Sequence, residues 1–182
     1  MDVPVSKAHL TLKVGRISVR IGAQALATFD AHRQRRFFDR EAGGQLFARV
    51  RVTDWEIVTA TGPRLRDRRG RFSFWPHRAS EQEEIFENHA LGLDYVGDWH
   101  THPEDSPTPS PGDLTSIAEV VRCSTHHLPG FLLMIVGRSP HPEGLWASFH
   151  SVEGARIVAE DMRVVPGFDD PLPESRKGRR KS

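Results

Sequence analysis

The sequence has little cysteine, no long apolar run and no recognisable signal peptide. Its single cysteine, Cys123, cannot form a disulfide within the chain and fits a reducing compartment. The longest apolar run, residues 131–136, is far shorter than the roughly 20 residues that span a bilayer. No basic segment followed by an apolar stretch opens the chain, so no signal peptide is expected. These absences predict a cytoplasmic protein without a membrane partner.

Charge of one sign is also scarce, because the 182 residues carry a formal net charge of only +1. Residues 1–165 are nearly neutral and lack the basic excess that is typical of nucleic-acid binders, so no nucleic acid partner is expected. The surplus lies in residues 166–182, which are rich in proline, glycine and charge and are predicted to form a disordered basic tail. Length and an apolar content of 37% predict one domain, residues 1–165.

The pattern of apolar residues predicts a mixture of strands and helices. Alternation predicts strands at residues 10–14 and 17–21, and a continuous apolar run predicts a buried strand at residues 131–136. Further strands are predicted at residues 46–50, 55–61, 72–75, 93–102, 146–152 and 156–165. Helical spacing predicts helices at residues 23–38, 80–91 and 111–124, the second of which opens on a capping box of Ser80 and Glu83. The arginine-rich residues 62–71 are predicted to be a solvated loop rather than an anion site. The order favours an α/β fold, with one mixed sheet flanked by two or three helices.

The chemistry lies in a short segment around two histidines. His100 and His102 point to the same face of a strand, with α-carbons roughly 6–7 Å apart, so both imidazoles can bind one metal ion. A loop with four prolines then leads to Asp113 at a helix start, and these prolines lower the entropy lost in ordering the loop. Two histidines and a carboxylate leave one tetrahedral position open for water, as in catalytic zinc sites. We therefore expect one Zn²⁺ per chain.

The spacing of this segment resembles the signature of the JAMM (JAB/MPN) zinc metalloprotease family: His-x-His, seven residues, a serine, two residues and an aspartate. Upstream, Glu41 and the glycines that follow it resemble the Glu-x-Gly-Gly-x-Leu segment of the family, and the resemblance covers roughly residues 10–160. It implies a single MPN/cytidine-deaminase-like domain, with Glu41 as general base and Ser110 stabilising the oxyanion. Ser110 is also a plausible N-cap for the helix that carries Asp113, and both roles can hold together.

Residues 60–63 and 95–103 resemble, more narrowly, prokaryotic JAB proteins encoded beside ubiquitin-like activating and conjugating enzymes, including those of CBASS antiphage operons. This resemblance implies an isopeptidase that hydrolyses the amide bond after the C-terminus of a ubiquitin-like or similarly conjugated protein. That protein is the expected partner, and the operon-encoded enzymes are candidate further partners. Two alternatives are a RadC-like protein with a DNA-repair role and a non-catalytic MPN interaction module. The neutral domain and Glu41 argue against the first, and the complete motif argues against the second.

Several other residues could suggest chemistry. Cys123, with His126 and His127 nearby, could suggest a second metal site, but we expect a small buried helix residue. Asp98 is expected either to support His100 or to face solvent. Trp99 alternates away from the histidines and is expected in the core. A zinc deaminase is excluded because the chain has one cysteine and no Pro-Cys-x-x-Cys motif.

Overall fold

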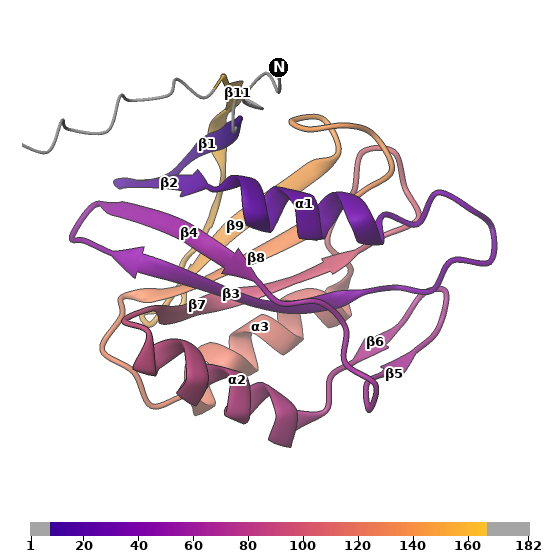
Figure 1. Cartoon of the computed structure of the whole chain (residues 1–182). Helices are drawn as coiled ribbons and strands as arrows, with labels where there is room; N and C mark the ends of the chain where they lie inside the picture. The colour runs from indigo at the N-terminus through magenta and orange to yellow at the C-terminus, as the bar shows by residue number, and fades with distance from the viewer. Residues whose placement is uncertain (1–7, 167–182) are drawn as a thin grey trace, which may run out of the picture.

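The computed structural model describes residues 8–166, which are built around one nine-stranded mixed sheet (Figure 1). The strands are β1 (His9–Val14), β2 (Ile17–Ile21), β3 (Gly43–Val50), β4 (Asp54–Ala60), β7 (Asp94–Thr101), β8 (Gly130–Val136), β9 (Leu145–Ser151), β10 (Arg156–Val158) and β11 (Glu160–Val165). Their order is β10-β9-β8-β7-β3-β4-β2-β1-β11. The pairs β2–β4 and β7–β8 are parallel, and the other neighbours are antiparallel.

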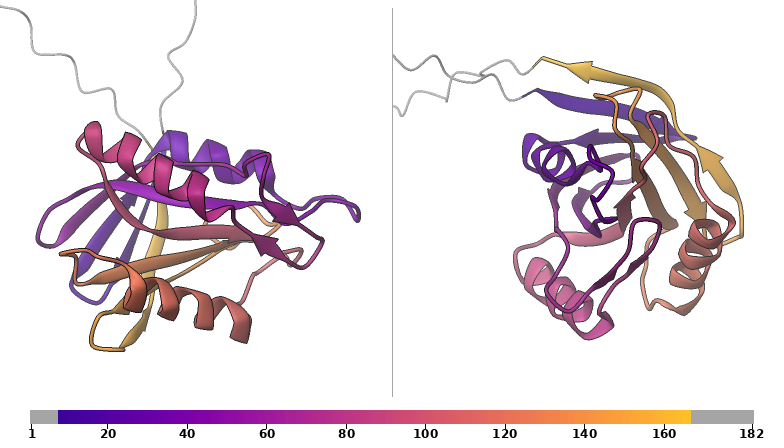
Figure 2. Two further views of the ribbon diagram at one scale, coloured as in Figure 1. Left: turned by 90° about the horizontal axis from the view of Figure 1, so that it is seen from below. Right: turned by 90° about the vertical axis from the view of Figure 1, so that its right-hand side faces the viewer.

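Three helices cover the sheet, so the prediction of a mixed α/β fold is confirmed. Helix α1 (Ala23–His32) lies on one side, and α2 (Arg78–Ala90) and α3 (Pro111–Cys123) lie on the other (Figures 1 and 2). The connection from β7 through α3 to β8 is the crossover that a parallel pair requires. None of the helices in the described residues has the length and apolar character to cross a membrane.

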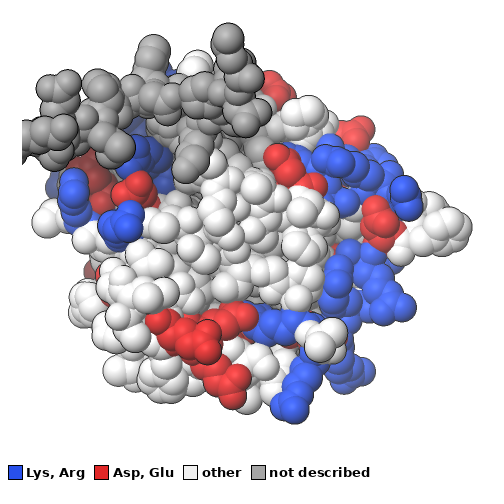
Figure 3. Space-filling model, viewed as in Figure 1, with Lys and Arg blue, Asp and Glu red and all other residues white. Residues whose placement is uncertain are grey.

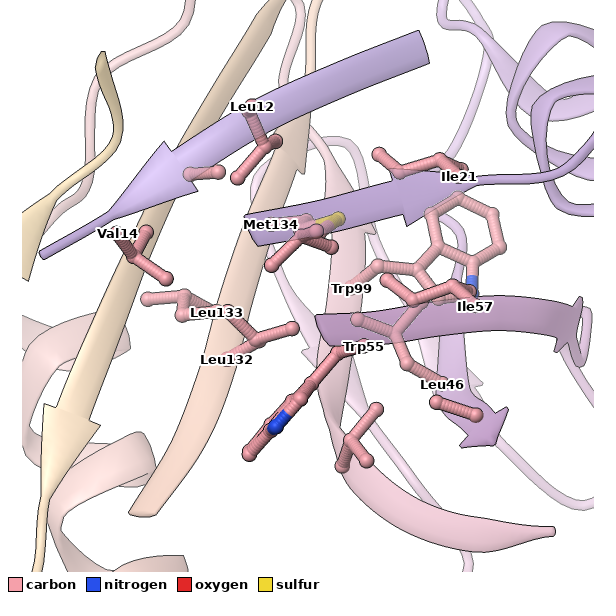
Figure 4. Packing of buried hydrophobic residues seen from close by; sticks show 14 of the residues in the cluster. Leu12, Val14, Ile21, Leu46, Trp55, Ile57, Trp99, Leu132, Leu133 and Met134 are labelled. Carbon is pink, nitrogen blue, oxygen red and sulfur yellow. The ribbon is translucent and has the colours of Figure 1, made fainter. Parts of the chain in front are cut away.

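Buried apolar side chains cover both faces of the sheet: Ile117 packs from α3 on one side, and another part of the core lies on the side that faces α1. Figure 4 shows large apolar side chains from several strands meeting there, among them Trp55, Leu46 and Trp99. The Trp99 ring lies 4.8 Å from that of Phe29 on α1, and its indole nitrogen donates to the backbone oxygen of Thr61 at 2.8 Å. Full burial of a large apolar side chain of this kind contributes about 1.5–3 kcal/mol by removal from water. The core position predicted for Trp99 is confirmed, so its two strand neighbours point to the opposite face.

Two predicted helix boundaries are wrong. Helix α1 ends at His32 rather than at residue 38, because Arg33 turns to an extended backbone. Its guanidinium donates to the carbonyl oxygens of Gly137 and Ser139, contacts that no local pattern reveals. Helix α2 begins at Arg78, and its N-cap is His77, whose ring nitrogen accepts from the Ser80 amide. The predicted capping box at residues 80–83 is therefore not formed.

The predicted loop at residues 62–71 is partly a strand. Within it, β5 (Arg68–Arg69) pairs with β6 (Phe74–Trp75) and forms a small hairpin. The burial predicted for Cys123 is also wrong, since this residue is exposed at the end of α3. The predicted tail lies outside the described residues, except for Pro166, so the division of the chain at residue 165 stays a prediction.

The strand predicted at residues 156–165 is two strands, and they lie at opposite edges of the sheet. Strand β10 pairs with β9, whereas β11 pairs with β1. The chain passes between the two edges at Ala159, whose amide donates to the backbone oxygen of Ala147 at 2.9 Å. Asp161, two residues later, has a positive φ of 52°. Because consecutive residues belong to both edges, the sheet is strongly curled (Figure 2).

Candidate metal centre and catalytic site

Strand β7 places the two histidines on the face of the sheet opposite to Trp99, in the pocket that α3 also lines. His100 pairs with Gly43 of β3 and with Ile135 of β8, and His102 follows directly after the strand end. The amide of His102 donates to the backbone oxygen of Val136 at 2.9 Å, which continues the pairing with β8. The two Nε2 atoms lie 3.2 Å apart. Alternation along one strand therefore brings both imidazoles to one point.

Helix α3 supplies the third side chain through its N-terminal cap. The Asp113 amide donates to Ser110 Oγ at 3.2 Å, and the Ser110 amide donates to Asp113 Oδ2 at 2.7 Å. Pro111 stands in the first turn, where its missing N–H costs nothing. The N-cap role predicted for Ser110 is confirmed. Because the cap fixes the carboxylate, Asp113 Oδ1 lies 3.2 Å from His100 Nε2, and its Oδ2 lies 3.4 Å from His102 Nε2.

These distances fit a tetrahedral metal ion. The three groups offer ligand atoms that all lie within 4.8 Å of one another. Ligands bound to zinc at about 2.0–2.1 Å are roughly 3.3 Å apart in a tetrahedron, close to the 3.2–3.4 Å found here. Two imidazoles and one carboxylate are the donor types that zinc takes when one position is left to water. The residues present therefore fit the metal that the sequence predicts.

The charges at this centre are coupled. Burial opposes ionisation of Asp113, but hydrogen bonds with His100 and His102 outweigh it and hold the pKa of the carboxyl well below its usual range. For His102, burial alone would lower the pKa of the imidazole. The hydrogen bond and the charge of Asp113 reverse this effect and raise the pKa. The carboxylate is therefore kept ionised, as metal binding requires.

Glu41 lies beside this centre on the segment between α1 and β3. Two hydrogen bonds to the Glu41 backbone hold that segment: the Glu41 amide donates to the Gly70 oxygen at 2.7 Å, and the Glu41 carbonyl oxygen accepts from the Arg69 side-chain Nε at 2.6 Å. The carboxylate is buried, and Oε1 lies 4.0 Å from His102 Nε2. Burial raises its pKa to about 7, with His102 opposing and the charge of Asp113 adding to the rise. A carboxyl group with this pKa can accept and return a proton near neutral pH.

All five predicted site residues line one pocket of about 600 Å³ between β7, α3 and the β5–β6 hairpin. The lining is rich in carboxylates and has one arginine, Arg78. The carboxylates are those of Glu41, Glu81, Asp98, Glu104, Asp113 and Glu119. Sequence reasoning had not assigned Glu81 to the site, because nothing in its helix marks it out. Phe72, Phe74 and Trp75 also line the pocket, and residues 72–75 were predicted as a strand, but no local signal places that strand beside the histidines.

Asp98 meets neither of the two expectations for it. It shares the strand face of His100 and lines the pocket, but Tyr95 is its hydrogen-bond partner and donates from its hydroxyl to Oδ1 at 2.8 Å. Burial and the charge of Glu81 raise the pKa of Asp98 to about 7, against the opposing effect of Tyr95. No hydrogen bond within the described part of the chain joins Asp98 to His100.

The glycines after Glu41 are required by close packing. A Cβ atom on Gly44 would lie 2.0 Å from the Thr61 oxygen, and one on Gly43 would lie 2.7 Å from both the Phe74 ring and the Trp99 oxygen. Gly97, on the neighbouring strand, has a φ of 146° and would place a Cβ 1.9 Å from the Leu132 oxygen. These positions let β3, β7 and the hairpin approach closely enough to assemble the pocket.

Fold and site together define a JAB-domain protein. Residues 23–150 match the family described as prokaryotic homologues of the JAB domain, and the chain belongs to this family. It is similar to proteins named CD-NTase/cGAS isopeptidase. It is 35% identical to that of Pseudomonas aeruginosa over 99 residues, which are 52% of this chain and 62% of the relative. It is 28% identical to that of Escherichia coli over 124 residues, which are 66% of this chain and 76% of the relative.

The first of these relatives is thus matched over less than two thirds of its length. A third, from Vibrio cholerae, is 42% identical over 72 residues, which are 40% of each chain. Among solved structures, the solution structure of a protein from Desulfitobacterium hafniense aligns with a TM-score of 0.53. The alignment covers 81% of this chain and 90% of that one, at 15% identity, so it supports the fold alone.

Proposed function

We propose that this protein is a zinc-dependent isopeptidase that hydrolyses the amide bond after the C-terminus of a ubiquitin-like or similarly conjugated protein. One observation carries the proposal: Glu41, His100, His102 and Asp113 converge in one pocket of a JAB-family chain. The relatives named CD-NTase/cGAS isopeptidase support the reaction class and make a conjugated nucleotidyltransferase the first substrate to test. The setting would be a cytoplasmic conjugation system in bacterial antiphage defence.

Different residues of the pocket would bind the metal and transfer the proton during amide hydrolysis. His100, His102 and Asp113 would hold a zinc ion, which polarises the scissile carbonyl and lowers the pKa of water to about 7. Glu41 takes a proton from the attacking water and passes it to the leaving amine, because its raised pKa of about 7 suits both steps. Burial of Glu41 keeps competing water away from the proton that it carries.

Ser110 can donate a hydrogen bond to the oxyanion while it remains the N-cap of α3. Its Oγ accepts a hydrogen bond from the Asp113 amide, and this leaves the hydroxyl proton free to donate. A donor at the mouth of the pocket stabilises the negative charge that develops on the carbonyl oxygen. The same side chain thus fixes a metal ligand and supports the transition state.

The test substrate is a fusion in which a reporter is joined to the C-terminus of the nucleotidyltransferase (CD-NTase). The fusion is incubated with the zinc-loaded protein. We expect cleavage at the junction, and loss of cleavage after chelation and in Glu41→Ala. General-base catalysis contributes about 10²–10⁴-fold, so the variant should lose turnover on that scale while keeping fold and zinc. Glu87→Ala, an exposed glutamate of α2, is the matched control. The proposal fails if the fusion stays intact while a nucleic acid or an unrelated peptide is hydrolysed.

A further inference from the structure

Four large aromatic side chains stand exposed beside the catalytic pocket. Phe37 is 71% exposed, Phe38 86%, Phe72 71% and Trp75 67%. Together with Arg71 we call them the aromatic–arginine rim. A single exposed apolar residue is normal on a protein surface, whereas a contiguous group marks an interaction site. The rim comes from two segments, the connection after α1 and the β5–β6 hairpin, which lie on one side of the molecule (Figure 1).

Arg71 ties these two segments together. Its guanidinium carbon lies 3.8 Å from the centre of the Phe37 ring and 5.1 Å from that of Phe72, and it also donates to the Phe37 oxygen. Phe37 and Phe38 meet edge to face, with ring centres 5.6 Å apart. The rim is therefore arranged before any partner arrives, which lowers the entropy lost on binding. Aromatic residues and arginine are also the types that dominate binding energy at interfaces.

The rim is basic, and the pocket beside it is acidic. Five exposed arginines flank the rim on the same two segments: Arg35, Arg36, Arg40, Arg66 and Arg68. None of them takes part in an ion pair within residues 8–166. Figure 3 shows basic side chains gathered on this side. In contrast, the pocket lining has six carboxylates and one arginine.

The change from positive charge at the rim to negative charge in the pocket indicates which kind of partner can bind there. A nucleic acid would be attracted by the arginines but repelled by the carboxylates of the pocket. A protein can satisfy both regions, because its folded body and its terminal segment can carry different charge. Phe72 and Trp75 belong to the rim and also line the pocket that holds Glu41, so a partner bound to the rim lies next to that pocket.

We infer that the aromatic–arginine rim docks the folded body of the protein whose C-terminal bond is cut, through an apolar face bordered by acidic residues. The inference rests on the proposed function and adds a second recognition region, which begins at the edge of the pocket and extends beyond it to Phe37 and Phe38. The body supplies affinity at the rim, and the C-terminal segment then extends into the pocket. A conjugate is thereby distinguished from a free peptide with the same terminal sequence.

The experiment compares two substrates, the CD-NTase–reporter fusion and the C-terminal segment of the CD-NTase alone joined to the same reporter. In the double variant Phe37→Ser, Phe38→Ser, kcat/KM for the fusion should fall about tenfold or more, through KM. Cleavage of the segment should be unchanged, because neither residue lines the pocket. Phe86→Ser is the matched control, since Phe86 is 67% exposed on α2. Equal losses on both substrates, or no loss on either, would overturn the inference.

A binding measurement separates this inference from the proposed function. Free CD-NTase is titrated onto Glu41→Ala protein with and without the rim substitutions, and onto Arg36→Glu, Arg66→Glu protein. We expect affinity to fall about tenfold in both double variants, and the salt dependence to weaken in the second. Arg16→Glu, at the turn between β1 and β2, should have no effect. If the fusion is never cleaved, the proposed function fails, while this titration still tests the rim.

Two outcomes of the titration would reject the rim as a protein-docking surface. The first is unchanged affinity for CD-NTase in both rim variants. The second is that the rim variants lose affinity for a short single-stranded DNA but keep their affinity for CD-NTase. The second outcome would assign the rim to nucleic acid.

Discussion

At the scale of single residues, Asp113 belongs to two structures at once. Its carboxylate accepts the Ser110 amide in the helix cap and also faces both histidines. The cap restricts the rotamer of Asp113, so helix formation prepares a ligand before any metal binds. We therefore expect removal of this side chain to affect helix stability as well as metal affinity, whereas neither histidine takes part in the helix cap.

We expect the purified protein to hold about one zinc per chain, since three ligands and a water complete a tetrahedron. His100→Ala, His102→Ala and Asp113→Ala should each weaken binding, as measured by elemental analysis after dialysis against a competing chelator. His89→Ala, at an exposed position of α2, is the control and should bind like wild type. A content below about a tenth of an equivalent after zinc reconstitution would contradict the metal assignment.

His141 should make stability depend on pH. It is only 8% exposed, and its Nε2 accepts from Arg33 at 2.9 Å. Burial, and then the charge of Arg33, lower its pKa to about 4, against the effect of Asp30. The unfolded chain binds the proton near pH 6.5, so stability falls as the pH drops from about 6.5 to 4. The loss reaches about 3 kcal/mol at most, at 1.36 kcal/mol per pKa unit.

The check is urea unfolding between about pH 7.5 and 3.5, a range that brackets the protonation of His141 in both the unfolded and the folded chain. His141→Gln keeps a hydrogen-bond acceptor but does not titrate, so its free energy of unfolding should vary less with pH. His127→Gln, at an exposed position, should keep the wild-type slope. Parallel profiles for wild type and His141→Gln would show that this buried histidine does not control acid stability.

At the scale of elements, the cap of α3 allows the two roles of Ser110 to be separated. Ser110→Ala should cost about 1 kcal/mol of stability, whereas Ser110→Gly should cost only a few tenths, because glycine is a tolerable N-cap. Both variants lose the hydroxyl donor, so both should lose about 10²–10³-fold in kcat if it stabilises the oxyanion. The measurements are thermal unfolding and fusion cleavage at saturating substrate. If kcat followed stability across the two variants, the hydroxyl would have a structural role only.

Elements whose signals are local were predictable from the sequence. Alternation predicted β1 and β2, and the spacing of His100, His102 and Asp113 predicted that these side chains would converge, as the structure shows. The end of α1 was not predictable, because Arg33 bonds to residues more than a hundred positions away. Glu41 was found through family resemblance, since spacing alone does not distinguish one glutamate from another. Its burial, and hence its raised pKa, required the fold.

At the scale of the whole molecule, the described domain contains every residue of the candidate site. We therefore expect that deleting residues 170–182 leaves both the melting temperature and fusion cleavage almost unchanged. That segment has few apolar side chains to bury. Differential scanning calorimetry and the cleavage assay check this. A fall of several degrees would show that the C-terminal residues pack on the domain, and that the boundary at residue 165 is wrong.

The passage of the chain through Ala159 has a consequence for resistance to aggregation. Strands β10 and β11 form the two edges of the sheet, and edge strands are where other chains can add by strand pairing. Because consecutive residues hold both edges in place, a single proteolytic cut near residue 159 would loosen both together. The exposed rows of amides and carbonyls on β9 and β1 would then be open to self-association. We therefore expect a chain that is cut near Ala159 to self-associate more readily than the intact chain.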